Sequence, residues 1–260
     1  MRPLVELDPT GIRGLFFDID DTLTTEGRLT SGSYAALDRW KAAGKIAVPI
    51  TGRPAGWCDH IARMWPVDAV VGENGAFYFR YDPVARALEK HFLFDEAVRT
   101  ANRTRMAAVR DRIFAEIPGC ALASDQLYRE ADLAIDFCED VAPLGLAAAE
   151  RIAVLMREAG MTAKVSSIHV NGWFGDYDKL GMTRTLARER LATDLDESGD
   201  CFAFVGDSPN DAPMFAYFRN SVGVANVKRY EGLLAAKPAF VTRGEAGTGF
   251  AELVTHLLGG

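Results

Sequence analysis

Short apolar runs alternate with amphipathic segments along the first third of the chain. The runs at 14–18, 45–50 and 69–71 are rich in Leu, Phe, Ile and Val and are predicted to be strands. The segments 34–43 and 54–64, which lie between them, repeat their apolar positions with helical spacing. Strands that alternate with helices of this length predict βαβ units in a parallel sheet.

The pattern changes in the middle of the chain, where strands and helices no longer alternate. Two strand-like segments flank Asp82 and Pro83 and predict a hairpin. The elements expected after it form a mixed set of helices and strands, with a turn near Ser166 and Ser167. These elements are a hairpin of 76–81 and 87–94, helices at 95–117 and 144–159, and strands at 133–137 and 162–173.

The alternation of strands and helices returns after about Asp178. Strands are expected at 201–205, 221–225 and 239–242, and helices at 179–191, 209–217 and 249–258. The predicted fold class is therefore α/β, with a Rossmann-like parallel sheet as the core and an inserted α+β cap domain. The predicted boundaries give a discontinuous core of 1–82 and 178–260 and a cap of 83–177.

Composition limits the class of partner. The chain has 260 residues, and its net charge of −7 argues against nucleic-acid binding, which needs a basic surface. No segment approaches the roughly 20 apolar residues of a membrane span, and the N-terminus does not resemble a signal peptide. The four cysteines are scattered, as is common in a reducing compartment. We therefore expect a cytoplasmic protein with no membrane partner and leave the oligomeric state open.

Oxygen-bearing side chains follow three of the predicted strands. Asp18 begins an acidic cluster with Asp20 and Asp21, Thr51 follows the second strand, and Asp207 follows the strand at 201–205. Ligands of open α/β sheets bind at the carboxyl ends of the strands, so these side chains can meet at one edge. Crowded carboxylates need a neutralising cation, and Mg²⁺ prefers oxygen ligands. The sequence therefore predicts a magnesium and phosphate site.

The same residues carry a resemblance to a known family. The chain resembles the haloacid dehalogenase-like (HAD) hydrolase superfamily, and within it the Cof-type, sugar-phosphatase-like branch with a large α/β cap. Four motifs occur in order, together with a branch-specific GENGA segment and the C-terminal pattern beginning GVAN. They are DxDxT at 18–22, the Thr of ITGRP at Thr51, the helix-opening lysine at Lys179, and GDxxND at 206–211.

The resemblance implies a role for each motif residue. Asp18 would be the nucleophile that forms an aspartyl-phosphate, and Asp20 the general acid and then the general base. Lys179 would be a fixed positive charge beside the phosphoryl group. The implied phosphate-binding residues are Thr51, Gly52, Lys179 and Asn210, and the implied Mg²⁺ ligands are Asp18, Asp20, Asp207 and Asp211.

The expected function is hydrolysis of a small phosphorylated metabolite, with a sugar phosphate as the first choice of substrate. A sugar phosphomutase of the phosphomannomutase-like type is the alternative enzyme, because it shares the architecture and a similar first motif. A non-catalytic binder would be expected to lack Asp18, Asp20, Lys179 or Asp207, and all four are present. A receiver-like phosphorylation sensor would not need an inserted domain.

For the residues expected to contact the rest of the substrate, a purely structural role is the alternative to substrate binding. Glu73 and Asn74 follow a strand and can be turn formers or a wall of the site facing the cap. His169, Asn171 and Trp173 alternate along a cap strand and so share one face. That face can bind a sugar, with Trp173 stacking on it, or it can be a solvated sheet surface.

Overall fold

The computed structural model describes residues 1–166 and 168–259, and its core is a six-stranded sheet in which every pair of neighbouring strands is parallel. The strand order places the first half of the core beside the second half, because β11 pairs with β2. In sheet order the strands are β1 (Arg2–Pro3), β13 (Phe240–Val241), β12 (Asn220–Gly223), β11 (Phe202–Gly206), β2 (Gly14–Phe17) and β3 (Ile46–Pro49). The predicted α/β class is confirmed.

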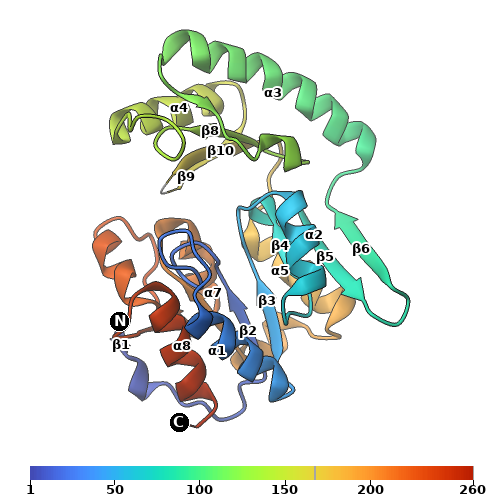
Figure 1. Ribbon diagram of the computed structural model, residues 1–260, viewed down its shortest axis with the longest axis vertical. Helices are drawn as coiled ribbons and strands as arrows, with labels where there is room; N and C mark the ends of the chain where they lie inside the picture. The colour runs from blue at the N-terminus through green and yellow to red at the C-terminus, as the bar shows by residue number, and fades with distance from the viewer. Residues whose placement is uncertain (167, 260) are drawn as a thin grey trace.

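Helices cover both faces of this sheet (Figure 1). Leu15 and Phe17 of β2 pack with α1 and α8, whereas Phe16 between them packs with α5 and α7 on the other face. This alternation explains why β2 is apolar at every position: a strand covered on both faces has no solvated side. The helices of the core are α1 (Ser31–Ala42), α2 (Ala55–Met64), α5 (Lys179–Arg190), α6 (Leu195–Ser198), α7 (Ala212–Tyr217) and α8 (Ala246–Leu257).

The third predicted strand differs from expectation. Strand β4 (Val70–Gly72) forms an antiparallel sheet with β5 (Phe77–Asp82) and β6 (Ala87–Phe92), and only a single parallel bridge, from Val71 to Ile50, joins it to the end of β3. The connection from β4 to β5 is one short turn, which leads the chain back beside β4 instead of across the parallel sheet.

A third sheet, antiparallel and four-stranded, lies above the core with two helices on its outer side (Figure 1). We call this unit the cap. Its strands, in order, are β7 (Ala121–Leu122), β8 (Leu133–Asp136), β10 (His169–Trp173) and β9 (Thr162–Val165), and its helices are α3 (Glu96–Glu116) and α4 (Leu146–Glu158). The helices bury one face of the sheet in the cap's own apolar cluster, so the opposite face is directed at the core.

The hairpin of β5 and β6 spans the predicted boundary between core and cap. Strands β5 and β6 pair with each other on the two sides of position 82, where the first core segment was predicted to end. The division into 1–82 with 178–260 and 83–177 stays a prediction. The predicted turn at Ser166 and Ser167 lies between β9 and β10, but Ser167 is outside the described residues. Among those residues, no helix has the length and apolar composition that a membrane crossing requires.

Candidate active site

The site begins where two neighbouring core strands end. Asp18 directly follows β2 and Asp207 directly follows β11, and these strands pair in parallel with Phe17 opposite Val205. The Asp18 N–H donates to the Val205 carbonyl at 2.9 Å, which continues the ladder by one bond. Asp18, Asp207 and Asp211 place carboxylate oxygens within 4.8 Å of one another. The expectation that acids following separate strands would meet at one edge is thus realised for Asp18 and Asp207.

Lys179 joins two of these acids. Its Nζ lies 2.7 Å from Asp18 Oδ1 and 2.8 Å from Asp211 Oδ1. Lys179 is the first residue of α5, and Asp178 caps the helix by accepting the Gly181 N–H. Asp211 is fully buried and also accepts the Asp207 N–H at 3.1 Å. The capped helix therefore holds a buried lysine in contact with the residue predicted to be the nucleophile.

The electrostatics of this group favour a bound cation. Burial raises the pKa of Asp18 to about 8, with Asp211 and Asp20 adding to the effect and Lys179 opposing it. Burial also raises the pKa of Asp207. Burial opposes the charged form of Lys179, but Asp18 and Asp211 outweigh it and raise the pKa of that amine. One lysine does not neutralise three buried carboxylates, so the oxygen-rich group fits a hard divalent cation such as Mg²⁺.

Two polar side chains donate hydrogen bonds to the carboxylate of Asp207. Thr22 Oγ1 donates to Asp207 Oδ1 at 3.4 Å, and Asn226 Nδ2 donates to Asp207 Oδ2 at 3.3 Å and to the Asp21 carbonyl at 2.9 Å. Neither residue was assigned a role from sequence. Both residues belong to motifs of the family, Thr22 to DxDxT and Asn226 to GVAN. Membership of these motifs was the sequence feature that could have predicted a role for them.

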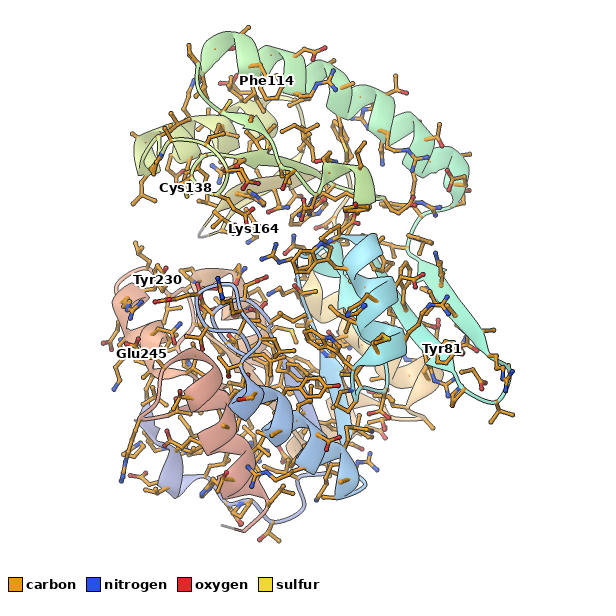
Figure 2. The ribbon with its side chains drawn as sticks, in the orientation of Figure 1. Tyr81, Phe114, Cys138, Lys164, Tyr230 and Glu245 are labelled. Atoms are coloured by element: carbon orange, nitrogen blue, oxygen red, sulfur yellow. The ribbon has the colours of Figure 1, made fainter. Side chains whose placement is uncertain are left out.

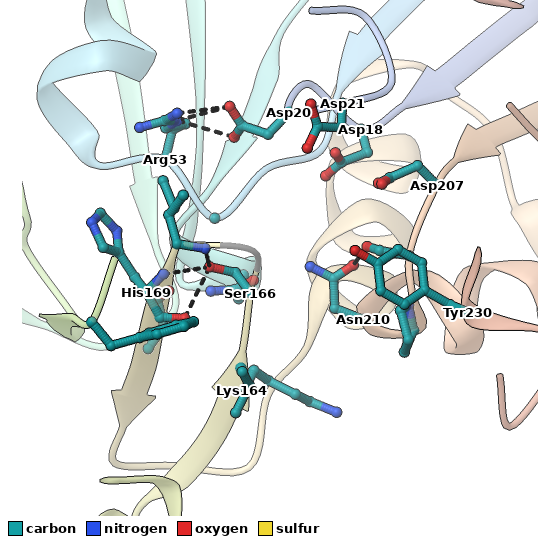
Figure 3. A pocket seen from close by; sticks show the side chains of 18 of the residues that line it. Asp18, Asp20, Asp21, Arg53, Lys164, Ser166, His169, Asp207, Asn210 and Tyr230 are labelled. Carbon is teal, nitrogen blue, oxygen red and sulfur yellow. Dashed lines mark hydrogen bonds and ion pairs between the residues drawn. The ribbon is translucent and has the colours of Figure 1, made fainter. Parts of the chain in front are cut away.

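Asp20 is engaged by an arginine that follows Thr51. Arg53 Nη2 lies 2.7 Å from Asp20 Oδ1, and Arg53 Nε lies 3.1 Å and 3.0 Å from the two oxygens. Figure 3 shows the Asp20 carboxylate directed at this guanidinium. Thr51 is fully buried after β3, and its Oγ1 accepts the Arg53 N–H at 3.0 Å. Arg53 was not predicted as a site residue, although it belongs to the ITGRP motif.

A cavity of about 740 Å³ lies between the core and the cap. The core contributes the acids together with Gly52, Asn74 and Asn210, and the cap contributes His169 and Asn171 (Figure 3). Thr51, Lys179 and Asp211 do not line the cavity. The lining also includes residues that sequence reasoning did not propose as site residues: Asp21, Arg53, Arg129, Phe137, Leu146, Glu150, Lys164, Val165, Ser166, Ile168, Ser208, Pro209, Tyr230 and Leu233.

Two proposed substrate residues lie outside this lining. Trp173 stacks on Tyr177 with ring centroids 5.4 Å apart and belongs to the apolar cluster of the cap. Glu73 is fully buried, and its carboxylate accepts backbone N–H groups from Ala55 in the core and from residues 130–132 in the cap. Glu73 therefore joins the two parts of the molecule and is not a wall of the cavity.

The cap side of the cavity is built on a buried ionic network. Arg129 donates to the Gly52 carbonyl at 3.1 Å and pairs with Asp125 and Asp132, and Asn171 Nδ2 donates to Asp132 at 3.0 Å. His169 is 3% exposed, and burial, with Arg129 nearby, lowers its pKa. Sequence reasoning missed Arg129 because its segment has no strand periodicity or motif to mark it.

Comparison with known proteins identifies the family. Residues 12–219 match the family of haloacid dehalogenase-like hydrolases, so the chain belongs to that family and is an enzyme of the hydrolase class. The resemblance to haloacid dehalogenase-like hydrolases that was predicted from the motifs is confirmed. No curated protein matches the sequence.

Several solved structures share the fold. A protein of Thermoplasma acidophilum has a TM-score of 0.69 at 16% identity, covering 95% of this chain and 98% of that one. An HAD/COF-like hydrolase of Plasmodium vivax has a TM-score of 0.67 at 16% identity and covers 95% and 96%. The sucrose-phosphatase of Synechocystis, crystallised with sucrose and phosphate, has a TM-score of 0.62 at 16% identity and covers 94% and 97%.

Proposed function

We propose that the protein is a Mg²⁺-dependent phosphoric monoester hydrolase that acts on a small phosphorylated metabolite, with a sugar phosphate as the preferred class. The contact of Lys179 with Asp18, beside Asp207 and Asp211, carries this proposal. It supplies a candidate nucleophile, a fixed positive charge and an acidic cation site in one buried group. The four cysteines are scattered along the sequence without CxxC spacing, which favours a reducing compartment, and we propose the cytoplasm.

In the first step an Asp18 carboxylate oxygen attacks the phosphorus, and the bond from phosphorus to the leaving oxygen breaks. Lys179 holds Asp18 in place and places positive charge beside the phosphoryl oxygens. Asp18, Asp20 through its backbone carbonyl, Asp207 and Asp211 are the proposed residues that would hold Mg²⁺. When bound, the ion would neutralise the charge of the phosphoryl group.

Asp20 is the proposed proton carrier in both steps. It gives a proton to the leaving oxygen, and it then removes a proton from the water that attacks the aspartyl-phosphate. Hydrolysis releases inorganic phosphate and regenerates Asp18. The bidentate pair with Arg53 orients the ionised carboxylate of Asp20 at the cavity wall, and the ionised form is the one that removes a proton from water.

The remaining cavity residues are proposed to bind the substrate. Thr51, Gly52 and Asn210 would bind phosphoryl oxygens, as the motifs imply. His169 and Asn171 line the cavity from the cap, and Asn74 lines it from the core, so these three side chains are placed to bind hydroxyl groups. Structural similarity to a sucrose-phosphatase adds support for a sugar phosphate.

Phosphate release from a panel of sugar phosphates tests the proposal. Release is expected with Mg²⁺, is expected to stop with a chelator, and is expected to be abolished in Asp18→Asn. Asp38→Asn is the matched control, because Asp38 is exposed on α1 and does not line the cavity. A folded protein that releases no phosphate but converts one sugar phosphate into its isomer in the presence of a sugar bisphosphate would favour the phosphomutase instead.

A further inference from the structure

Two exposed leucines line the cavity from opposite parts of the molecule. Leu146 begins α4 in the cap and is 74% exposed, and Leu233 lies in a turn of the core that precedes β13 and is 73% exposed. Single exposed leucines are common on protein surfaces. Two that line the same cavity form part of an apolar surface, which is what marks a binding site.

Further apolar side chains extend this surface. Val165, at the end of β9, lines the cavity from the cap, and Tyr230 lines it from the core. Figure 2 labels Tyr230 and Lys164, the neighbour of Val165, on the two sides of the space between core and cap. We call Leu146, Val165, Tyr230 and Leu233 the apolar mouth.

The acids line the core side of this cavity, and Tyr230 of the apolar mouth lies on the same side, beside Asn210 (Figure 3). Figure 3 shows Asp18, Asp20 and Asp207 together, with Lys164 on the far side of the view. A substrate whose phosphoryl group reaches Asp18 would therefore extend between His169 of the cap and Tyr230 of the core toward Lys164, the neighbour of Val165 (Figure 3). The wall of the cavity therefore offers apolar side chains in addition to charged and polar ones.

The positive charges of the wall are balanced. Arg53 pairs with Asp20, and Arg129 pairs with Asp125 and Asp132. The cap lysine and a glutamate, Lys164 and Glu150, both line the cavity. The wall beyond the phosphoryl end therefore offers no excess of positive charge to a second anionic group.

The cavity is larger than one sugar phosphate needs. Its volume of 740 Å³ lies in the upper part of the range of roughly 300–1,000 Å³ that holds drug-sized ligands. A monosaccharide phosphate that fills the charged and polar parts leaves the apolar mouth empty. An apolar surface left in water gains nothing from binding, whereas a ligand that covers it gains hydrophobic stabilisation.

We propose that the substrate is a phosphate ester whose leaving group carries an apolar part beyond its polar, hydroxyl-bearing part. The apolar part lies in the mouth between Leu146 and Val165 of the cap and Tyr230 and Leu233 of the core. The inference rests on the proposed function for the identity of the phosphoryl end. It adds the chemistry of the distal end, which the family membership does not specify.

Three probes test the inference: glucose 6-phosphate, phenyl glucoside 6-phosphate and a disaccharide phosphate. The disaccharide, like the phenyl compound, extends past the first sugar, but its second part is polar. The expected kcat/KM for the phenyl compound exceeds the other two by at least about tenfold, because the ring is buried in the mouth. Equal values for the phenyl compound and either of the other probes would overturn the inference.

Serine variants separate binding from closure of the cap. Leu146→Ser and Leu233→Ser are expected to lower the ratio of kcat/KM for phenyl glucoside 6-phosphate to that for glucose 6-phosphate at least threefold or so. The matched control is Leu127→Ser, an exposed cap leucine outside the cavity lining, which is expected to leave the ratio unchanged. If both esters lose activity equally, the leucines meet each other when the cap closes, and the inference is wrong.

Calorimetry on Asp18→Asn distinguishes this inference from the proposed function. Tighter binding of the phenyl compound than of glucose 6-phosphate, without turnover by the unaltered enzyme, would reject the phosphatase and keep the apolar mouth. Turnover of all three probes at similar kcat/KM, with equal binding, would keep the phosphatase and reject the mouth as a substrate site.

Discussion

At the residue scale the site depends on one lysine placed between two carboxylates. Lys179 contacts Asp18 and Asp211 from the first turn of α5, and all three side chains are buried. The motif could assign Lys179 a role because a lysine that opens a helix after the cap is typical of the family. The resemblance implied that Asn210 and Asp211 would hold Lys179 or the waters of the metal, and the choice between these two residues was left open, because it depends on how the loop after β11 turns. The structure shows Asp211 in contact with Lys179.

Lys179→Met is expected to reduce phosphate release at least about 100-fold, because a charge that acts on the transition state is removed from a water-poor site. Steady-state kinetics with saturating Mg²⁺ measure the change. Lys237→Met is the matched control, since Lys237 pairs with Glu231 on the surface. A loss below about fivefold would show that Lys179 has no catalytic role and only balances buried charge.

His169 predicts a pH effect on stability. Its pKa is lowered in the folded protein by burial, from an ordinary value of 6.5. The unfolded chain therefore binds the proton more tightly, so the stability associated with neutral His169 is present above about pH 6.5 and is lost as the pH falls through the lower folded pKa.

The free energy of unfolding in urea is expected to fall less in His169→Gln than in the unaltered protein between about pH 7.5 and about pH 5. His60→Gln, at an exposed position of α2, serves as the control and should follow the unaltered protein. Parallel curves for His169→Gln and the unaltered protein would mean that His169 titrates equally in both states.

At the scale of elements, most helices and strands followed from apolar periodicity, because burial on one or both faces imposes it. The exceptions have local causes. Strand β4 looked like a third parallel strand, and the turn that returns it to β5 contains Glu73 and Asn74 at positive φ, which no periodicity reveals. Strand β7 has only two residues, too few to show a period.

Gly75 ends the turn between β4 and β5, and its contact with the start of α5 predicts that a substitution in this turn affects that helix. Gly75 has a φ of +108°, and a Cβ there would lie 2.0 Å from the Asp178 carbonyl oxygen, at the start of α5. Gly75→Ala must therefore shift the segment that carries Lys179. The expected cost exceeds the roughly 1–2 kcal/mol of a positive φ alone, and phosphate release should fall with it.

Gly11→Ala isolates the conformational part of this cost. Gly11 has a φ of +80° with no atom near the added Cβ, so it suffers the same kind of backbone strain without the contact. Urea denaturation of both variants, with activity measured alongside, compares them. If Gly75→Ala were as stable and as active as Gly11→Ala, the contact with α5 would be unimportant.

At the scale of the whole molecule, the relation of cap to core could not be predicted from sequence. Alternation along β10 correctly placed His169 and Asn171 on one cavity-facing surface, but Trp173 lies past the cavity against Tyr177. The motif marked Glu73 as a candidate site residue, but its contact with the cap was not predicted. The cap N–H groups whose hydrogen bonds Glu73 accepts belong to residues 130–132, which are far from it along the chain.

Glu73→Ala is expected to lower the free energy of unfolding by at least about 3 kcal/mol, since the N–H groups of Ala55 and of the 130–132 segment lose their acceptor. The exposed Glu197→Ala is the control. Urea denaturation measures both. A change in Glu73→Ala no larger than that in Glu197→Ala would mean that water replaces the carboxylate at these donors.

The pairing of β2 with β11 has a consequence for the order of assembly. During synthesis β2, which precedes Asp18, leaves the ribosome long before its neighbour β11, and the whole cap is made between them. Closing such a long loop is slow, so pairing this distant in sequence delays folding of the core, whereas the strands of the cap find their partners nearby. The acidic group cannot exist until β11 has been made, and a chain released before that point carries a cap with no catalytic centre beneath it.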